Sequence, residues 1–150
     1  MDNKPAVLLV EDEAGLRELY EEELNKAGFL VFAVANGEEA LAIIKERKVA
    51  SVILDIMLPG MSGLDVLAKM RSEEATKETP VYLLTALEDT DDRARGISLG
   101  ATEYLAKNEV SPEDVIAKIK STSNAPTEPT ESTSPTNSDQ NEPNTVDSTS

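Results

Sequence analysis

The amino-acid sequence predicts an α/β fold in which five parallel strands alternate with five helices. Short apolar runs rich in β-branched residues recur along residues 1–120, and stretches with helical spacing of their apolar residues lie between them. Parallel strands are joined by a crossover of about a dozen residues or more, usually a helix. We therefore expect one doubly wound sheet with helices on both faces.

The strands are expected at the apolar runs and the helices at the amphipathic stretches between them. The predicted strands comprise residues 6–10, 29–34, 49–55, 80–85 and 101–107. The predicted helices comprise residues 16–27, 36–45, 62–71, 88–99 and 111–120.

Residues at the helix ends support these elements in turn. The first helix is followed by Gly28, a natural stop, and the second opens with Asn36 as a cap. The third begins at Ser62, and the fourth is led by acidic residues, which suit a helix start. The fifth has Ser111 at the cap and Pro112 at the first helical position.

The composition changes sharply after Lys120. All 14 basic residues lie before that point, whereas residues 121–150 contain seven Ser, seven Thr, four Pro, four Asn and five acids. Such a segment cannot bury enough apolar surface to offset its ordering entropy. We therefore expect a folded domain over residues 1–120 and a disordered acidic tail, rich in Ser, Thr, Pro and Asn, over residues 121–150.

Composition excludes several kinds of chemistry. The chain has no cysteine and no histidine, which excludes disulfides, thiol catalysis, imidazole bases and most zinc or copper sites. A formal net charge of −15 repels nucleic acid and anionic lipid. No apolar run approaches the length of a signal sequence or a membrane span. We expect a cytoplasmic protein that binds neither nucleic acid nor membrane.

Polar side chains mark the carboxyl ends of the predicted strands, where open α/β sheets carry their sites. The first strand is followed by Glu11 and Asp12, the third ends in Asp55, the fourth in Thr85 and the fifth in Lys107. If the first and third strands are neighbours, the three carboxylates converge. Two unit charges about 5 Å apart at an effective dielectric near 20 repel by roughly 3 kcal/mol. Such a group needs a cation, and oxygen ligands without His or Cys favour Mg²⁺.

Each of these residues also has an ordinary structural explanation. The acid pair could cap the first helix, Asp55 could be a turn residue, and Lys107 could lie in solvent. Thr85 suits a strand end, and Tyr104 could be a core residue. Their joint arrangement at strand ends is what favours a functional site.

Motifs in order along the chain resemble the receiver domain of two-component response regulators. They are E-D at 11–12, D-I-M-L-P-G-M-S-G at 55–63, L-T-A at 84–86 and G-A-T-E-Y-L-A-K at 100–107. The resemblance spans nearly all of residues 1–120. It implies a five-stranded parallel sheet with the flavodoxin-like strand order 2-1-3-4-5.

The resemblance implies an acceptor and a metal site. Asp55 would be the phosphoacceptor. It would bind Mg²⁺ together with Asp12 and the backbone carbonyl of Met57. Glu11 would act on the metal through a water molecule.

The resemblance also implies a phosphate-responsive switch. Thr85 and Lys107 would contact oxygens of the phosphoryl group after transfer. Ala86 is small, as the family prefers where the phosphate needs access. Tyr104 would be the switch aromatic, which turns inward when Thr85 moves.

The implied function is that of a stand-alone response regulator, since no output domain follows the predicted domain. A sensor histidine kinase or a histidine phosphotransfer protein would supply the phosphoryl group. The downstream partner would be a protein that binds the face formed by the fourth helix, fifth strand and fifth helix. Such a chain assists its own phosphotransfer and dephosphorylation but is not a conventional turnover enzyme.

Two features depart from the family pattern or extend it. Receivers usually follow the lysine with a cis proline, whereas here the pair is Lys107-Asn108, for which we expect a trans bond or a mobile loop. Met57 and Leu87, two residues beyond Asp55 and Thr85, are both apolar. We expect them to screen an acyl phosphate from water and to lengthen its lifetime.

Three other classes of protein share part of this pattern. A phosphohydrolase of the haloacid-dehalogenase kind needs an acid-base group where this chain has Met57. A flavodoxin-like cofactor binder needs a phosphate-binding loop, which the acidic run 11–13 would repel. A receiver that is never phosphorylated and serves only as a docking module remains the alternative function.

Overall fold

The computed structural model describes residues 4–86 and 90–124. It divides into a unit of residues 1–117 and a unit of residues 118–150. The strands are β1 (Ala6–Val10), β2 (Leu30–Val34), β3 (Ser51–Asp55), β4 (Val81–Thr85) and β5 (Glu103–Ala106). The helices are α1 (Ala14–Lys26), α2 (Gly37–Glu46), α3 (Gly63–Arg71), α4 (Thr90–Ser98) and α5 (Pro112–Asn124).

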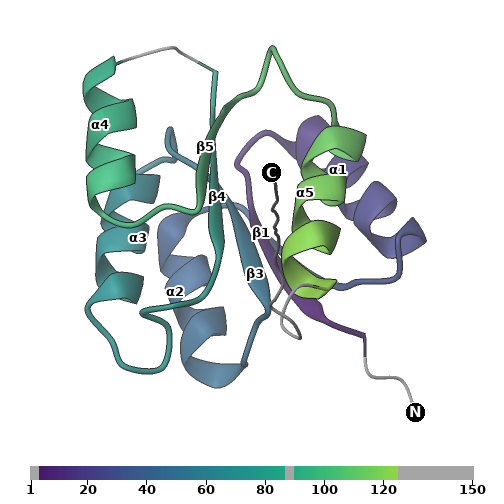
Figure 1. Cartoon of the computed structure of the whole chain (residues 1–150), viewed down its shortest axis with the longest axis horizontal. Helices are drawn as coiled ribbons and strands as arrows, with labels where there is room; N and C mark the ends of the chain where they lie inside the picture. Colours follow the sequence, from purple (N-terminus) through teal and green to yellow (C-terminus); the bar gives the residue numbers. More distant parts are fainter. Residues whose placement is uncertain (1–3, 87–89, 125–150) are drawn as a thin grey trace, which may run out of the picture. The chain divides into compact units, whose positions relative to one another are not determined.

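The five strands form one parallel sheet in the order β2-β1-β3-β4-β5 (Figure 1). This confirms the predicted fold class and strand order. Val10 is in register with Leu54, and Thr85 is in register with Ala106. The carboxyl ends of the central strands therefore lie at one edge of the sheet, close to one another.

Helices cover both faces of the sheet. In Figure 1, α2, α3 and α4 lie on one side of the strands, and α1 and the first turns of α5 lie on the other. The main core is on the α2–α3 side, where alternate strand residues such as Leu8, Val10, Val52 and Leu54 pack with Leu67. Successive strand residues point to opposite faces, which explains why strand β3 is buried along its whole length.

Local capping explains where several helices begin. The Ser62 side chain accepts a hydrogen bond from the Leu64 amide, and the Asp65 carboxylate accepts one from the Ser62 amide. This capping box starts α3 immediately after the loop that follows β3. Asn36 caps α2 as predicted, by accepting a hydrogen bond from the Glu39 amide at 2.9 Å.

Gly63 lets α3 begin directly against the end of β3. A Cβ atom at this position would overlap the backbone carbonyl of Asp55. The Gly63 amide donates a hydrogen bond of 2.9 Å to the carbonyl of Ile56. Only glycine allows this close approach, so this residue helps to position the end of the strand that carries Asp55.

Most elements differ from the sequence expectations by one or two residues at an end, and α5 differs by more. Helix α1 begins at Ala14 rather than residue 16, with Glu13 in an extended conformation at its cap. Helix α5 runs to Asn124, four residues beyond Lys120, where we expected the domain to end. Residues 125–150, the rest of the predicted tail, lie outside the described residues. Among those described, no helix is long and apolar enough to cross a membrane.

Candidate functional site

Three carboxylates meet at the carboxyl edge of the sheet. Glu11 and Asp12 follow β1, Asp55 ends the neighbouring strand β3, and their ligand oxygens all lie within 4.8 Å of one another. Glu11 and Asp55 are only 1% and 2% exposed, whereas Asp12 is exposed. The arrangement follows from the adjacency of β1 and β3 in the sheet. We call Glu11, Asp12 and Asp55 the acid cluster.

Lys107 supplies the positive charge nearest to the acid cluster. Its ammonium nitrogen lies 2.9 Å from Asp55 Oδ2 and 2.7 Å from Glu11 Oε1. The Lys107 amide donates a hydrogen bond of 2.8 Å to the Thr85 carbonyl, which aligns the end of β5 with that of β4. No cis peptide bond occurs among the described residues, so the Lys107-Asn108 bond is trans, which is one of the two alternatives expected.

Backbone amides hold the remaining carboxylate oxygens. The Met57 amide donates to Asp55 Oδ1 at 3.1 Å, and the Glu13 amide donates to Glu11 Oε2 at 3.0 Å. Glu11 Oε1 contacts Lys107 as an ion pair, but the geometry of this contact is not that of a hydrogen bond. Both buried carboxylates are therefore fixed in orientation before any ligand binds.

Arg17 is a residue at this site that the sequence analysis did not single out. Its guanidinium donates a hydrogen bond of 2.9 Å to the backbone carbonyl of Glu11, six positions earlier in the chain. A basic residue near the start of a helix is unfavourable with respect to the helix dipole, and α1 has no acidic residue in its first turn. That mismatch was the available signal that Arg17 has a specific partner.

Burial and neighbouring charges shift the pKa values of Glu11 and Lys107. Burial raises the pKa of the Glu11 carboxyl, and the nearby charge of Asp55 raises it further, against the opposing effects of Lys107 and the Glu13 amide. Burial alone would lower the pKa of Lys107, but Glu11 and Asp55 together raise it above its usual value. Lys107 is therefore firmly protonated at neutral pH.

The acid cluster fits a magnesium ion. Its ligands are all carboxylate oxygens, which is the donor set that this hard cation prefers. The three carboxylates carry up to three negative charges and Lys107 carries one positive charge, so a divalent cation would balance the remainder. Asp12 is exposed, which leaves room for the water molecules that Mg²⁺ keeps when it binds to protein.

The remaining predicted site residues lie on or next to β4, β5 and the loop after β3. Thr85 ends β4 and is 2% exposed, and the exposed Ala86 follows it. Tyr104 is buried on β5, with the Arg93 guanidinium 5.5 Å from its ring centre. The Met57 side chain is 55% exposed, and only its amide is seen bonded to Asp55. Leu87, the second residue proposed to screen the phosphate, lies outside the described residues.

Together, the sheet order and the acid cluster define a doubly wound α/β protein with a group of oxygen ligands at the carboxyl edge of its sheet. Residues 7–120 match the family model of the response regulator receiver domain. The chain therefore belongs to the response regulator receiver domain family.

Solved structures of receiver proteins have the same fold. The chemotaxis response regulator CheY4 of Vibrio cholerae matches with a TM-score of 0.73 and 28% identity, over 79% of this chain and 98% of that chain. The receiver domain of the sensor histidine kinase PA1611 from Pseudomonas aeruginosa matches with a TM-score of 0.71 and 25% identity, over 79% of this chain and 96% of that one. The PA1611 domain has a magnesium ion coordinated in its active site cleft.

Curated relatives include transcriptional regulators. The phosphate regulon transcriptional regulatory protein PhoB of Pseudomonas aeruginosa is 35% identical over 114 residues, which is 76% of this chain and 49% of PhoB. The transcriptional regulatory protein HprR of Escherichia coli is 42% identical over 101 residues, which is 67% of this chain and 44% of HprR. The chain thus spans about half the length of the curated relatives it matches.

Proposed function

We propose that Asp55 accepts a phosphoryl group from the phosphohistidine of a partner protein and that the new charge switches a protein-interaction surface. The observation that carries this proposal is the state of Asp55 itself. It is buried, its two oxygens are oriented by Lys107 and the Met57 amide, and it lies within 4.8 Å of two further carboxylates. A structural aspartate at a strand end has no need of this arrangement.

The transfer requires a nucleophilic oxygen and a way to manage charge. A carboxylate oxygen of Asp55 forms a bond to phosphorus as the bond between phosphorus and the imidazole nitrogen breaks, and the imidazole keeps that electron pair. The charge at the position of Asp55 changes from −1 to about −2. When bound at the acid cluster, Mg²⁺ would offset this negative charge and that of the phosphoryl oxygens.

Lys107 and Thr85 are the groups placed to respond to the phosphoryl group. Lys107 already contacts Asp55, and it can turn its hydrogen bonds toward the new oxygens. Thr85 ends the strand next to β3, so its hydroxyl is a second donor at the same edge. Ala86 leaves the approach to Asp55 free of a large side chain.

The output would pass through β5 and the helices beside it. Tyr104 is packed on β5 beneath Arg93 of α4, so a shift of Thr85 can be transmitted to the face formed by α4, β5 and α5. Reversing a two-state equilibrium from 1:99 to 99:1 takes about 5.5 kcal/mol of differential interaction. A few charge-assisted hydrogen bonds and one repacked aromatic residue can supply that amount.

Receiver domains interact with histidine kinases and with downstream targets. We propose a sensor histidine kinase or a histidine phosphotransfer protein as the donor and a protein that binds the α4–β5–α5 face as the target. In this role the chain assists one transfer to itself and its reversal, rather than acting as a turnover enzyme. The expectation of a stand-alone, cytoplasmic regulator that binds no nucleic acid stays a prediction.

Intact mass spectrometry tests this function directly. The chain is incubated with phosphoramidate, with and without Mg²⁺, beside the variants Asp55→Asn and Asp65→Asn. Asp65 is an exposed carboxylate on α3, and asparagine preserves its size, so this variant is a matched control. We expect a Mg²⁺-dependent phosphoryl adduct on the wild type and on Asp65→Asn, but none on Asp55→Asn. Folded wild type that binds no Mg²⁺ and gains no adduct would favour the docking module instead.

A further inference from the structure

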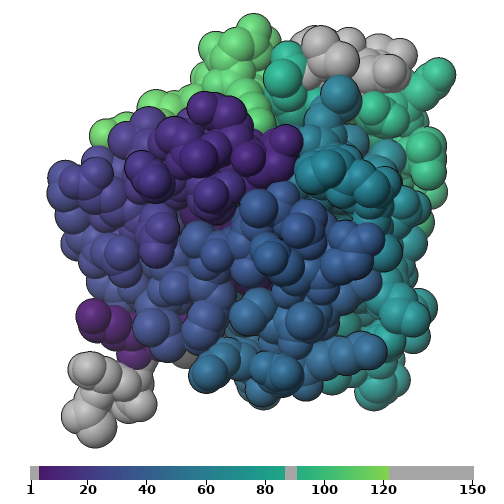
Figure 2. Space-filling model, turned by 180° about the vertical axis from the view of Figure 1, so that it is seen from behind, coloured from purple at the N-terminus to yellow at the C-terminus, as the bar shows by residue number. Residues whose placement is uncertain are grey.

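A basic hollow lies at the end of the sheet opposite to the acid cluster. Two adjoining hollows of about 350 and 490 Å³ share the segment 46–49, which joins α2 to β3. Basic side chains line them from two parts of the chain: Lys45, Arg47 and Lys48 at the end of α2, and Lys4 before β1. We call this surface the basic hollow. Figure 2 shows the face that carries α2 and the loop after it, coloured blue.

Among the described residues, the positive charges of the basic hollow have no acidic partners. All four side chains belong to exposed residues, and within residues 4–86 and 90–124 none of them forms an ion pair with a carboxylate. By contrast, Lys26, Lys69 and Lys77 each pair with a nearby glutamate. The single acidic residue that lines the hollow, Glu46, does not balance the four cations.

The fold itself explains only part of this charge. Lys45 lies in the last turn of α2, where a cation interacts favourably with the helix dipole. Lys48 and Lys4 lie outside the helix, and no structural role in the described residues requires their charges. The chain has a net charge of −15, so a group of cations without acidic partners among the described residues is a local exception to its negative charge.

The basic hollow also has an apolar side. Leu30 is 48% exposed, and it lines the hollow together with Phe32. The Arg47 guanidinium lies 5.0 Å from the centre of the Phe32 ring, so a cation and an apolar surface are presented together. Both apolar residues are on β2, which is one of the two edge strands of the sheet.

We propose that the basic hollow binds an acidic, extended segment of a partner protein that carries an apolar side chain. Its carboxylates would lie against Lys45, Arg47 and Lys48, and its apolar side chain would cover Leu30. This binding site is separate from the phosphoacceptor site, and the proposal does not rest on phosphorylation of Asp55. Charge complementarity identifies the partner, because only a negatively charged ligand pairs these cations.

A peptide fits these observations better than nucleic acid or an anionic membrane. Four cations around a hollow do not form the extended basic track that a phosphate backbone needs, and the net charge of the chain opposes both polyanions. A membrane surface would also require more exposed apolar residues than Leu30 alone provides. A short peptide can match both the charges and the apolar patch at this scale.

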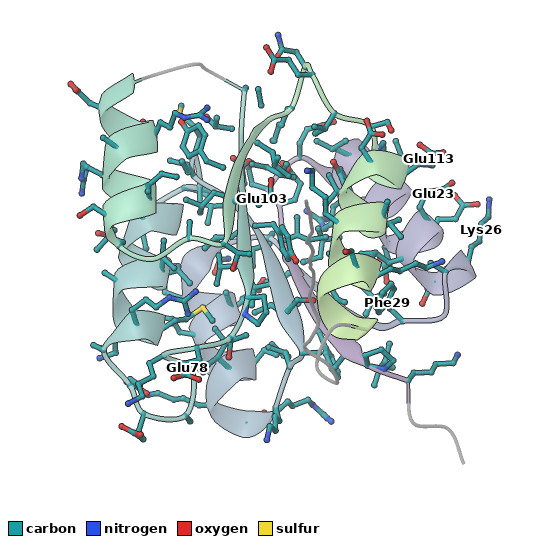
Figure 3. The ribbon with its side chains drawn as sticks, viewed as in Figure 1. Glu23, Lys26, Phe29, Glu78, Glu103 and Glu113 are labelled. Atoms are coloured by element: carbon teal, nitrogen blue, oxygen red, sulfur yellow. The ribbon has the colours of Figure 1, made fainter. Side chains whose placement is uncertain are left out.

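Binding is tested on the full chain with a fluorescein-labelled peptide of alternating glutamate and leucine, followed by fluorescence anisotropy. The test variant is Arg47→Gln with Lys48→Gln, and the control is Lys26→Gln with Lys77→Gln. The control removes the same net charge from residues that are paired with glutamates, as Figure 3 shows for Lys26 beside Glu23 on α1. The test variant should weaken binding by about tenfold or more, and the control should change it by less than about twofold.

The apolar part of the proposal has its own variant. Leu30→Thr places a β-branched residue, which suits a strand, at the start of β2 but removes much of the apolar surface. It should weaken binding of the glutamate–leucine peptide and leave unchanged the weaker binding of a glutamate–serine peptide. Asp55→Asn should bind the first peptide as tightly as the wild type does, so failure of the proposed phosphotransfer would not affect the result.

Zero-length carbodiimide cross-linking identifies the occupant of the basic hollow. A product that joins Lys45 or Lys48 to the probe peptide supports the proposal. A product that joins either lysine to an acid within residues 125–150, or to a second copy of the chain, would overturn it and assign the hollow to that occupant. Tighter binding of single-stranded DNA or of phosphatidylserine vesicles, lost in the Arg47→Gln, Lys48→Gln variant, would overturn it as well.

Discussion

Replacing Lys107 by methionine should destabilise the folded chain, because it leaves two buried carboxylates without a cation. Glu11 and Asp55 lie within 4.8 Å of each other, and at an effective dielectric near 20 they repel by about 3 kcal/mol. Lys107 is closer to each of them, at 2.7 and 2.9 Å, so its attraction outweighs that repulsion in the wild type. Breaking a buried pair by removing one partner costs about 3–5 kcal/mol.

The expected loss lies near the lower end of that range. The Lys107 side chain is 19% exposed, so water screens part of its interaction with the two carboxylates. We therefore expect the Lys107→Met variant to lose about 3 kcal/mol in free energy of unfolding. Urea denaturation in the presence of a chelator measures this loss. The matched control Lys26→Met removes an exposed lysine of α1 and should cost less than about 1 kcal/mol.

Magnesium should partly restore the stability of the Lys107→Met variant. A metal ion that binds only the folded chain stabilises it in proportion to the logarithm of its concentration over Kd. Without the neighbouring ammonium group, the acid cluster attracts a divalent cation more strongly, by about tenfold or more in Kd. The reasoning would be refuted if the variant unfolded at the wild-type urea concentration in chelator. It would also be refuted if Mg²⁺ stabilised the variant less than the wild type.

Three further perturbations test the structure that supports the site. Gly63→Ala should lower the free energy of unfolding, measured in urea, by more than about 2 kcal/mol, because the new Cβ would overlap the Asp55 carbonyl. The control Gly28→Ala places its Cβ in open space and should lose only about 1 kcal/mol, because the residue has a positive φ. Ser62→Ala removes the capping box of α3 and should cost about 1 kcal/mol by the same assay. Burial and nearby carboxylates raise the pKa of Tyr20 to about 12, so the free energy of unfolding should fall as pH rises from about 10 to 12, by about 2 kcal/mol. Tyr20→Phe, compared by urea unfolding across that pH range, should lack this fall.

The alternation of elements could be predicted because local chemistry determines it. Asn36 and Ser62 cap helices that begin where their side chains indicate. The strand order, by contrast, was predicted from the family resemblance, because the residues of a strand do not indicate which other strand lies beside it. The far end of α5 was placed too early. Polar composition predicted the stop at Lys120, but the first proline comes only at Pro126, so no residue in 121–124 forces the helix to end.

The acid cluster could be predicted, because the ends of the strands can be recognised in the sequence. The contacts within the site could not be predicted. Glu11 was expected to act through a metal-bound water, and the structure shows it paired with Lys107 at 2.7 Å. This pairing depends on the side-chain conformations of residues far apart in the sequence. The bond from Arg17 to the Glu11 carbonyl likewise depends on how α1 packs on the sheet. Motif spacing carries no information on either contact.

The site depends on the register of the strands as well as on the identity of its residues. Asp55 ends β3 and Lys107 follows β5, and β4 lies between these two strands in the sheet. Because side chains alternate between the faces of a strand, a slip of one residue would turn Asp55 away from its partners. The Lys107 amide bonded to Thr85 and the close approach of Gly63 to Asp55 both oppose such a slip. Backbone contacts that contribute no chemistry thus determine whether a strand-end carboxylate can act as an acceptor.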